Sequence, residues 1–173
     1  LILINTCSVR EKPEHKVYSA LGRFKRLKEE GGTIIGVAGC VAQQEGRLLL
    51  ERIPYLDLVL GTQAIPLLPQ MLQRIEVSGE QVCETSFDPK GTYLKASLPK
   101  KGMTTTRVKS YVTIMQGCDR FCSFCIVPYV RGRERSRSSR EIVEEVRRLG
   151  ETGVKEICLL GQNVNAYGKG LEE

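Results

Sequence analysis

Hydrophobic residues in the first third of the chain alternate between strand-like and helix-like segments. Short runs rich in Val, Ile and Leu predict buried strands at residues 1–4, 33–38 and 56–60. After each run, apolar residues recur with helical spacing, which predicts helices at residues 13–28, 42–52 and 65–74. Because strands alternate with helices, we expect right-handed crossovers and a parallel, three-layer α/β domain.

The hydrophobic periodicity is lost over residues 76–107, where Ser, Thr, Gly, Pro and Lys dominate. This composition predicts a connector, with an edge hairpin at residues 91–96. We therefore place a first domain at residues 1–75 and a second at residues 108–173.

The second domain repeats the order strand, helix, strand. Residues 110–115 and 154–160 predict strands, and Ile142 and Leu149 lie on the apolar stripe of a helix between them. Residues 138–141 have the pattern of a capping box. Two strands cannot bury both faces of a parallel sheet, so we expect this second domain to be cut short.

Composition and charge narrow the class of protein. The 173 residues are 41% hydrophobic and carry a net charge of +6, without an apolar run long enough to span a membrane. The first residues lack the basic region of a secretory signal, so we expect a cytoplasmic protein.

The chain has seven cysteines with uneven spacing, which is not the pattern of a disulfide framework. In the cytoplasm, clustered cysteines indicate metal or redox chemistry.

Basic residues are concentrated in residues 131–140, where five arginines accompany the single acid Glu134. A solvated loop would have the same composition. Because arginine binds phosphate through two parallel hydrogen bonds, we favour contact with an RNA backbone. The arginines are Arg131, Arg133, Arg135, Arg137 and Arg140.

Three cysteines follow the first predicted strand of the second domain with the spacing C-x3-C-x2-C, at Cys118, Cys122 and Cys125. Three thiolates on a short loop can ligate three corners of a 4Fe-4S cluster and leave the fourth iron open. Zinc is the competing metal, but a closed zinc site needs a fourth ligand. The one histidine, His15, lies in a distant predicted helix, so we favour iron–sulfur.

This spacing, with Phe124 before the last cysteine, resembles the radical S-adenosylmethionine enzymes. The amino-acid sequence around the cysteines resembles one family of these enzymes, the methylthiotransferases. The matching segments are residues 114–118, 126–132 and 160–168, together with residues 5–12. Within this family, the branch acting on isopentenyladenosine in tRNA is the most similar. The resemblance implies an N-terminal methylthiotransferase domain followed by the start of a radical S-adenosylmethionine partial barrel.

Carried onto this chain, the resemblance implies that Cys118, Cys122 and Cys125 hold a 4Fe-4S cluster that binds S-adenosylmethionine. It implies cofactor contacts for Phe124, Gly161 and Gln162, although Phe124 could equally be a core aromatic. The arginine run could steady the cofactor carboxylate instead of RNA. Beyond the cluster ligands, no catalytic side chain can be assigned.

Cys7 and Cys40 each follow a predicted parallel strand, so both would emerge at the carboxyl edge of the same sheet. The resemblance implies that they ligate a second, auxiliary 4Fe-4S cluster, whose third ligand we expect to be missing from this chain. We assign no role to Cys83 or Cys158.

The implied reaction inserts sulfur and then transfers a methyl group to carbon 2 of isopentenyladenosine beside the tRNA anticodon. Its implied partners are the anticodon stem-loop and an electron donor such as flavodoxin, and we expect a monomer without a membrane partner. Alternatives are a sister methylthiotransferase acting on ribosomal-protein aspartate or on threonylcarbamoyladenosine, or a non-catalytic RNA-binding module stabilised by metal. Because most of the barrel is absent, we expect these 173 residues alone to be inactive.

Overall fold

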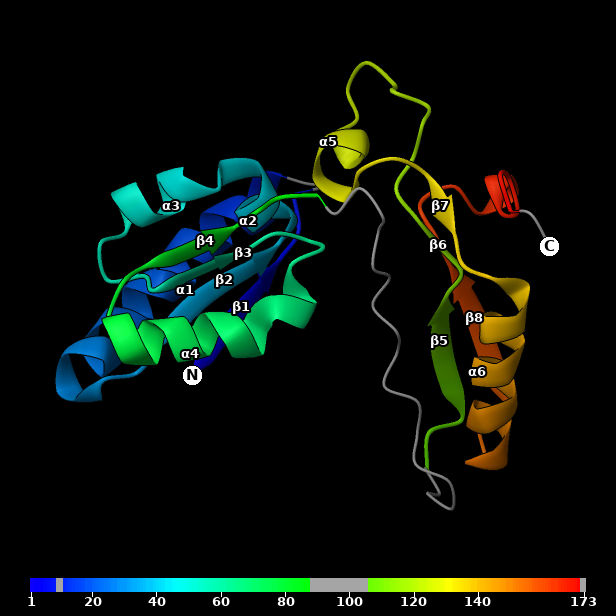
Figure 1. Cartoon of the computed structure of the whole chain (residues 1–173), viewed down its shortest axis with the longest axis horizontal. Helices are drawn as coiled ribbons and strands as arrows, with labels where there is room; N and C mark the ends of the chain where they lie inside the picture. The colour runs from blue at the N-terminus through cyan, green and yellow to red at the C-terminus, as the bar shows by residue number, and fades with distance from the viewer. Residues whose placement is uncertain (9–10, 88–105, 172–173) are drawn as a thin grey trace. The chain divides into compact units, whose positions relative to one another are not determined.

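The structure of the chain is a computed structural model that describes residues 1–8, 11–87 and 106–171. The chain forms two compact units, residues 1–92 and 93–173, and the boundary falls within the predicted connector (Figure 1). Among the described residues, none of the helices is both long enough and apolar enough to cross a membrane.

The first unit contains a four-stranded parallel sheet in the order β1-β2-β3-β4. The strands are β1 (Ile2–Thr6), β2 (Ile35–Gly39), β3 (Leu58–Leu60) and β4 (Val82–Glu84). β2 and β3 are buried throughout, as their continuous apolar sequences require in a sheet covered on both faces. The predicted parallel α/β architecture is confirmed.

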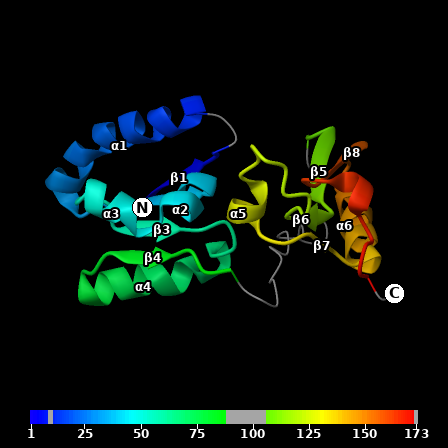
Figure 2. The same cartoon turned by 90° about the horizontal axis from the view of Figure 1, so that it is seen from above.

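Helices cover both faces of this sheet, which makes three layers (Figure 2). They are α1 (Glu11–Gly31), α2 (Cys40–Glu45), α3 (Arg47–Arg52), the short 3-10 helix η1 (Ile65–Leu67) and α4 (Leu68–Ser78). On one face, Leu21 of α1 and Leu49 of α3 pack against Val37 and Val59. On the other face, Met71 of α4 packs with Leu58 and Leu60.

Two details differ from the sequence prediction. The helix predicted at residues 42–52 is divided at Gly46, whose φ of +53° ends α2 before α3 begins. The predicted connector contributes an ordered strand, because β4 lies within residues 76–107 and pairs with β3. The hairpin predicted at residues 91–96 lies outside the described residues.

The second unit is built on a parallel pair of strands, β5 (Lys109–Thr113) and β8 (Glu156–Leu160), joined through helix α6 (Ser139–Glu151). β6 (Met115–Gln116) pairs antiparallel with β7 (Arg135–Ser136), and between them lie the cysteine loop and helix α5 (Val127–Arg131). A 3-10 helix, η2 (Val164–Ala166), follows β8. Apolar residues of β5, α6 and β8 form the core, so the predicted strand–helix–strand order is confirmed.

The predicted capping box does not form. Ser138 is the N-cap of α6, but within the described residues its side chain caps no backbone N–H. The Glu141 carboxylate lies 4.0 Å from Arg137 Nε. The acid therefore lies near the Arg137 cation that precedes the N-cap.

Candidate metal centre

The cysteine loop leaves β6 through Gly117, which has a φ of +78°. A Cβ at this position would lie 2.5 Å from the carbonyl oxygen of Gly132 and closer still to that of Arg133. The next residue, Cys118, donates its backbone N–H to the Gly132 carbonyl oxygen at 3.2 Å. The start of the loop is thus held directly against the end of α5, an approach that only glycine permits.

Two residues that follow β8, Gly161 and Gln162, lie against the start of the cysteine loop. The Gly117 N–H donates a 2.7 Å hydrogen bond to Oε1 of Gln162. A Cβ on Gly161 would contact the Met115 side chain and would lie 3.2 Å from Val164 Cγ1. Gly161 therefore permits close packing beside β6, and Gln162 anchors the residue before Cys118. Their direct contact with a cofactor stays a prediction.

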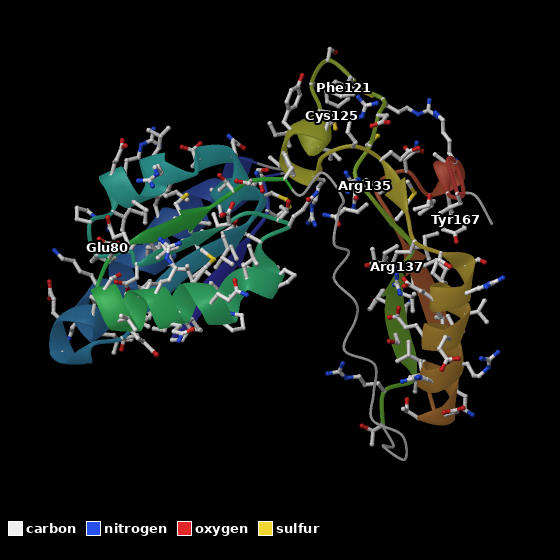
Figure 3. The ribbon with its side chains drawn as sticks, viewed as in Figure 1. Glu80, Phe121, Cys125, Arg135, Arg137 and Tyr167 are labelled. Atoms are coloured by element: carbon white, nitrogen blue, oxygen red, sulfur yellow. The ribbon has the colours of Figure 1, made fainter. Side chains whose placement is uncertain are left out.

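The three cysteines share one loop. Cys118 and Cys125 are half-buried, Cys122 is exposed, and all three are free thiols. The N–H of Cys125 donates to the Cys122 carbonyl oxygen at 3.0 Å, which closes a turn before α5 (Figure 3). Across the part of the chain that the structure describes, no three Cys, His, Asp or Glu side chains are gathered as a metal site.

The donor chemistry of this loop nevertheless fits an iron–sulfur cluster. Thiolates are the ligands that such clusters require, and none of these three is consumed by a disulfide. Because the thiols sit on an accessible turn rather than in a packed core, ligation does not require the core to open.

The aromatic residues of the loop are largely solvent-exposed. Phe124 is 94% exposed, so the alternative of a core aromatic is wrong, while its contact with a cofactor stays a prediction. Phe121 has a positive φ of 46°, which is unusual for a residue other than glycine. Its ring lies edge-to-face against Tyr129, with 6.1 Å between the ring centroids.

Asp119, at the start of the cysteine loop, contacts Arg133 and Glu134, which follow α5. No role for Asp119 was predicted from the sequence. Its Oδ1 lies 2.9 Å from Arg133 Nε and accepts a 3.0 Å hydrogen bond from the Glu134 N–H. Its Oδ2 accepts a 3.2 Å hydrogen bond from the Arg133 guanidinium. The hydrogen bond from Glu134 and the nearby Arg133 cation hold the pKa of Asp119 below its usual value. The sequence could not predict the Asp119–Arg133 pair, because the two residues are brought together only when the loop folds.

A pocket of about 290 Å³ opens beside this pair. Its wall includes Asn163, whose side-chain amide donates to the Glu134 carboxylate at 3.2 Å. The lining is polar and contains both signs of charge: Asp119, Arg120, Glu134, Asn163, Ala166 and Lys169.

Two members of the arginine run form ion pairs with acids elsewhere in the chain. Arg133 pairs with Asp119, and Arg137 pairs with Glu145 at 2.7 Å. Both acids lie outside residues 131–140, so the local composition could not reveal them. Arg131 and Arg135 also interact within the chain, whereas Arg140 is exposed. The run as a whole is therefore not a free phosphate-binding surface.

In the first unit, Cys7 and Cys40 follow the paired strand residues Thr6 and Gly39. The Thr6 hydroxyl donates to the Ala38 carbonyl oxygen at 2.7 Å and accepts from the Val41 N–H at 3.1 Å. These bonds fasten the ends of β1 and β2 together, so both cysteines lie at the carboxyl edge of the sheet. Cys7 is exposed and Cys40 is buried, and their role as ligands stays a prediction.

The remaining described cysteines lie in strands. Cys83 is part of β4, where partial burial raises the pKa of its thiol, and Cys158 is part of β8. They are separate from the cysteine loop in sequence, and we assign neither a role.

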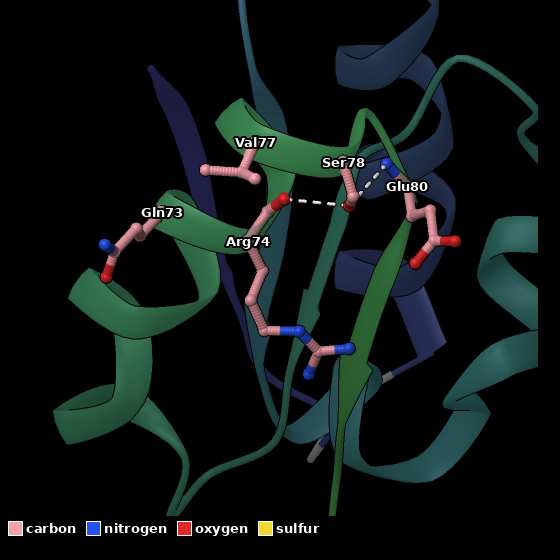
Figure 4. A pocket seen from close by; sticks show the side chains of 5 residues that line it. All are labelled: Gln73, Arg74, Val77, Ser78 and Glu80. Atoms are coloured by element: carbon pink, nitrogen blue, oxygen red, sulfur yellow. Dashed lines mark hydrogen bonds between the residues drawn. The ribbon is translucent and has the colours of Figure 1, made fainter.

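A second pocket, of about 320 Å³, lies at the end of α4 (Figure 4). The Ser78 hydroxyl donates to the Arg74 carbonyl oxygen at 2.9 Å and accepts from the Glu80 N–H at 3.2 Å. Gly79 then ends the helix in the left-handed conformation. These contacts are those of an ordinary helix C-terminus, and we assign no ligand to this pocket.

Comparison with known families shows what each of the two units is similar to. Residues 112–173 match the Radical SAM superfamily, and residues 1–61 match the family described as Uncharacterized protein family UPF0004. The predicted resemblance to radical S-adenosylmethionine methylthiotransferases, and the order of the two domains, are thereby confirmed. The Radical SAM superfamily implies S-adenosylmethionine and an iron–sulfur cluster.

Individual relatives make the similarity more specific. The chain is 53% identical over 168 residues to the tRNA-2-methylthio-N(6)-dimethylallyladenosine synthase of Geobacter metallireducens, covering 97% of this chain and 37% of that protein. It is 55% identical over 169 residues to the synthase of the same name from Pelobacter propionicus, covering 97% and 38%. The Myxococcus xanthus synthase is 49% identical over 173 residues, covering 99% and 37%. The chain thus spans just over a third of the length of these relatives.

Proposed function

We propose that this chain belongs to a tRNA methylthiotransferase that inserts sulfur and transfers a methyl group to carbon 2 of isopentenyladenosine next to the anticodon. The observation that carries the proposal is the near-complete alignment of the chain, at about half identity, with synthases of that name. The placement of Cys118, Cys122 and Cys125 on one accessible loop after the first strand of the second unit supports it.

In this proposal, the three loop cysteines hold a 4Fe-4S cluster that binds S-adenosylmethionine. Held by these thiolates and reduced by an external electron donor, such a cluster would supply one-electron reductive chemistry to the bound S-adenosylmethionine. The protein positions and shields this chemistry. Gly117 and Gln162 fix the start of the loop, as their hydrogen bond supports, and Gly161 lies beside it. Phe124 is free in this structure to cover the cofactor.

The first unit would supply Cys7 and Cys40 to the auxiliary 4Fe-4S cluster that handles sulfur. Their common position at the carboxyl edge of the β1–β2 pair supports this role, because open α/β sheets bind ligands at that edge. We propose a second domain at residues 108–173 and a first domain that extends from residues 1–75 through β4, because β4 pairs with β3 in the same sheet. We further propose tRNA as substrate, an electron donor such as flavodoxin, a monomeric state and a cytoplasmic location.

The test uses the complete protein that contains this chain. Expressed in a bacterial strain that lacks the methylthio modification, it should restore 2-methylthio-isopentenyladenosine, which mass spectrometry of digested tRNA detects. An inactive control should carry alanine at Cys118, Cys122 and Cys125.

Other products would redirect the assignment. Modified ribosomal-protein aspartate or methylthiolated threonylcarbamoyladenosine, without the isopentenyladenosine product, would move the protein to a sister branch. A colourless protein that binds zinc and no iron would contradict the enzyme and favour a metal-stabilised RNA-binding module.

A further inference from the structure

The backbone is strained between the first two cysteines of the loop. Phe121 precedes Cys122 directly and adopts a φ of +46°, a region that L-residues other than Asn, Asp and His rarely occupy. Such a conformation persists only when its surroundings hold it. It lies immediately before a proposed ligand, so whatever stabilises it also affects where Cys122 lies relative to Cys118.

Two contacts hold the Phe121 ring from outside its own segment. The Tyr129 ring, on α5, lies edge-to-face against it with an angle of 85° between the ring planes. The Arg133 guanidinium carbon lies 5.8 Å from the Phe121 ring centroid, within the range of a cation–π contact. The strained residue is therefore held between α5 and the segment that joins α5 to β7.

The Arg133 guanidinium is itself oriented by Asp119. Arg133 Nε is 2.9 Å from Oδ1 and a terminal nitrogen donates to Oδ2 at 3.2 Å, so the guanidinium lies in a two-point contact with the carboxylate. Oδ1 also accepts the Glu134 N–H, and the neighbouring Cys118 N–H binds Gly132. Asp119 thus closes the base of the loop and directs Arg133 toward Phe121.

This pair is a poor candidate for a purely stabilising interaction. The Arg133 and Asp119 side chains are 72% and 31% exposed, and exposed ion pairs contribute little to folding stability. Its geometric effect is local, since every contact described for it lies within the segment from Cys118 to Glu134.

We propose that Asp119 and Arg133 are positioning residues for the cysteine loop: their ion pair holds the left-handed conformation of Phe121 and thereby sets the placement of Cys118 and Cys122 around the cluster. The inference rests on the proposed function, because it takes these cysteines as cluster ligands. Neither residue needs to touch the cofactor, since each acts through the loop backbone or through the Phe121 ring.

The test compares variants of the complete protein after anaerobic reconstitution with iron and sulfide. Asp119→Asn keeps the oxygen that accepts the Glu134 N–H but removes the charge, and Arg133→Met keeps the stem but removes the guanidinium. Glu144→Gln is the matched control, because Glu144 is also exposed and binds two arginines, at 2.7 and 2.8 Å. Measured quantities are the thermal midpoint, the change in the cluster's electron paramagnetic resonance spectrum on adding S-adenosylmethionine, and the rate of 5′-deoxyadenosine formation.

We expect Asp119→Asn and Arg133→Met each to slow 5′-deoxyadenosine formation about tenfold and to alter the spectrum, with the thermal midpoint of the wild type. The double variant should be no slower than either single variant, and Arg133→Lys should recover part of the rate. Wild-type rates and spectra in both single variants would overturn the inference, as would an equal loss in Glu144→Gln or a loss accompanied by a lower thermal midpoint. A wild-type protein that assembles no cluster at this loop would instead contradict the proposed function and the inference with it.

Discussion

Replacing Gly117 by alanine in the complete protein is expected to abolish iron binding at the cysteine loop. The added Cβ would enter the space of the Gly132 and Arg133 carbonyl oxygens, at a residue whose φ is already +78°. The left-handed conformation alone costs a non-glycine residue about 1–3 kcal/mol, and neither carbonyl can withdraw without moving the end of α5. The loop would therefore separate from α5, and Cys118 would lose its backbone hydrogen bond to Gly132.

The measurement is iron and sulfide per protein, read together with the visible absorbance of the reconstituted protein. Gly150→Ala is the matched control, because Gly150 lies in α6 with open space where its Cβ would be placed. Alanine is there expected to be neutral or to stabilise the helix by up to about 1 kcal/mol. Normal iron content in Gly117→Ala would contradict the loop geometry described above.

Glu145→Gln is expected to destabilise the second unit by about 3 kcal/mol, because it removes the nearer counter-charge of a buried cation and leaves only the Glu141 carboxylate, 4.0 Å from Arg137 Nε. The Arg137 and Glu145 side chains are only 7% and 5% exposed, and their ion pair spans 2.7 Å. Arg137 also donates to the Thr113 carbonyl oxygen at 2.6 Å, and its own carbonyl oxygen accepts from the Tyr167 hydroxyl at 3.0 Å. The pair thus fastens α6 to the end of β5.

Urea unfolding of the 173-residue chain, followed by circular dichroism, measures this loss. Arg147→Met removes a cation from an exposed ion pair on the same helix and should change stability by less than about 1 kcal/mol. Replacing both partners, as Arg137→Met with Glu145→Leu, should destabilise less than Glu145→Gln, since no charge is left buried. Equal effects of Glu145→Gln and Arg147→Met would show that the buried pair does not fasten the helix.

Local sequence patterns were sufficient for the main elements of the fold. Continuous apolar runs identified β2 and β3, because strands buried on both faces have no polar alternation to obscure them. The run at residues 1–4 identified β1, but the prediction that this strand is buried was wrong: it lies at the end of the sheet and alternates half-buried with exposed residues. Helical spacing identified α1, α4 and α6. β4 was missed because it has only three residues and lies in a polar segment, so its pairing with β3 is a tertiary effect.

For the candidate site, the sequence predicted the cysteines but not the residues that hold their loop. Cys118, Cys122 and Cys125 are recognisable because their spacing is local. The contact of Asp119 with Arg133 and the bond from Gly117 to Gln162 join residues far apart in the chain, so only the fold reveals them. The same reason explains why Arg137 was interpreted as an RNA contact rather than a buried cation.

The most direct test of the central proposal is the formation of 5′-deoxyadenosine from S-adenosylmethionine by the reduced, reconstituted complete protein. We expect the wild type to form it, and Cys118→Ala, Cys122→Ala and Cys125→Ala each to form none. Cys158→Ala, a thiol in β8 outside the loop, should retain the wild-type rate. Wild-type rates in any of the three loop variants would contradict the assignment of Cys118, Cys122 and Cys125 as the cluster ligands.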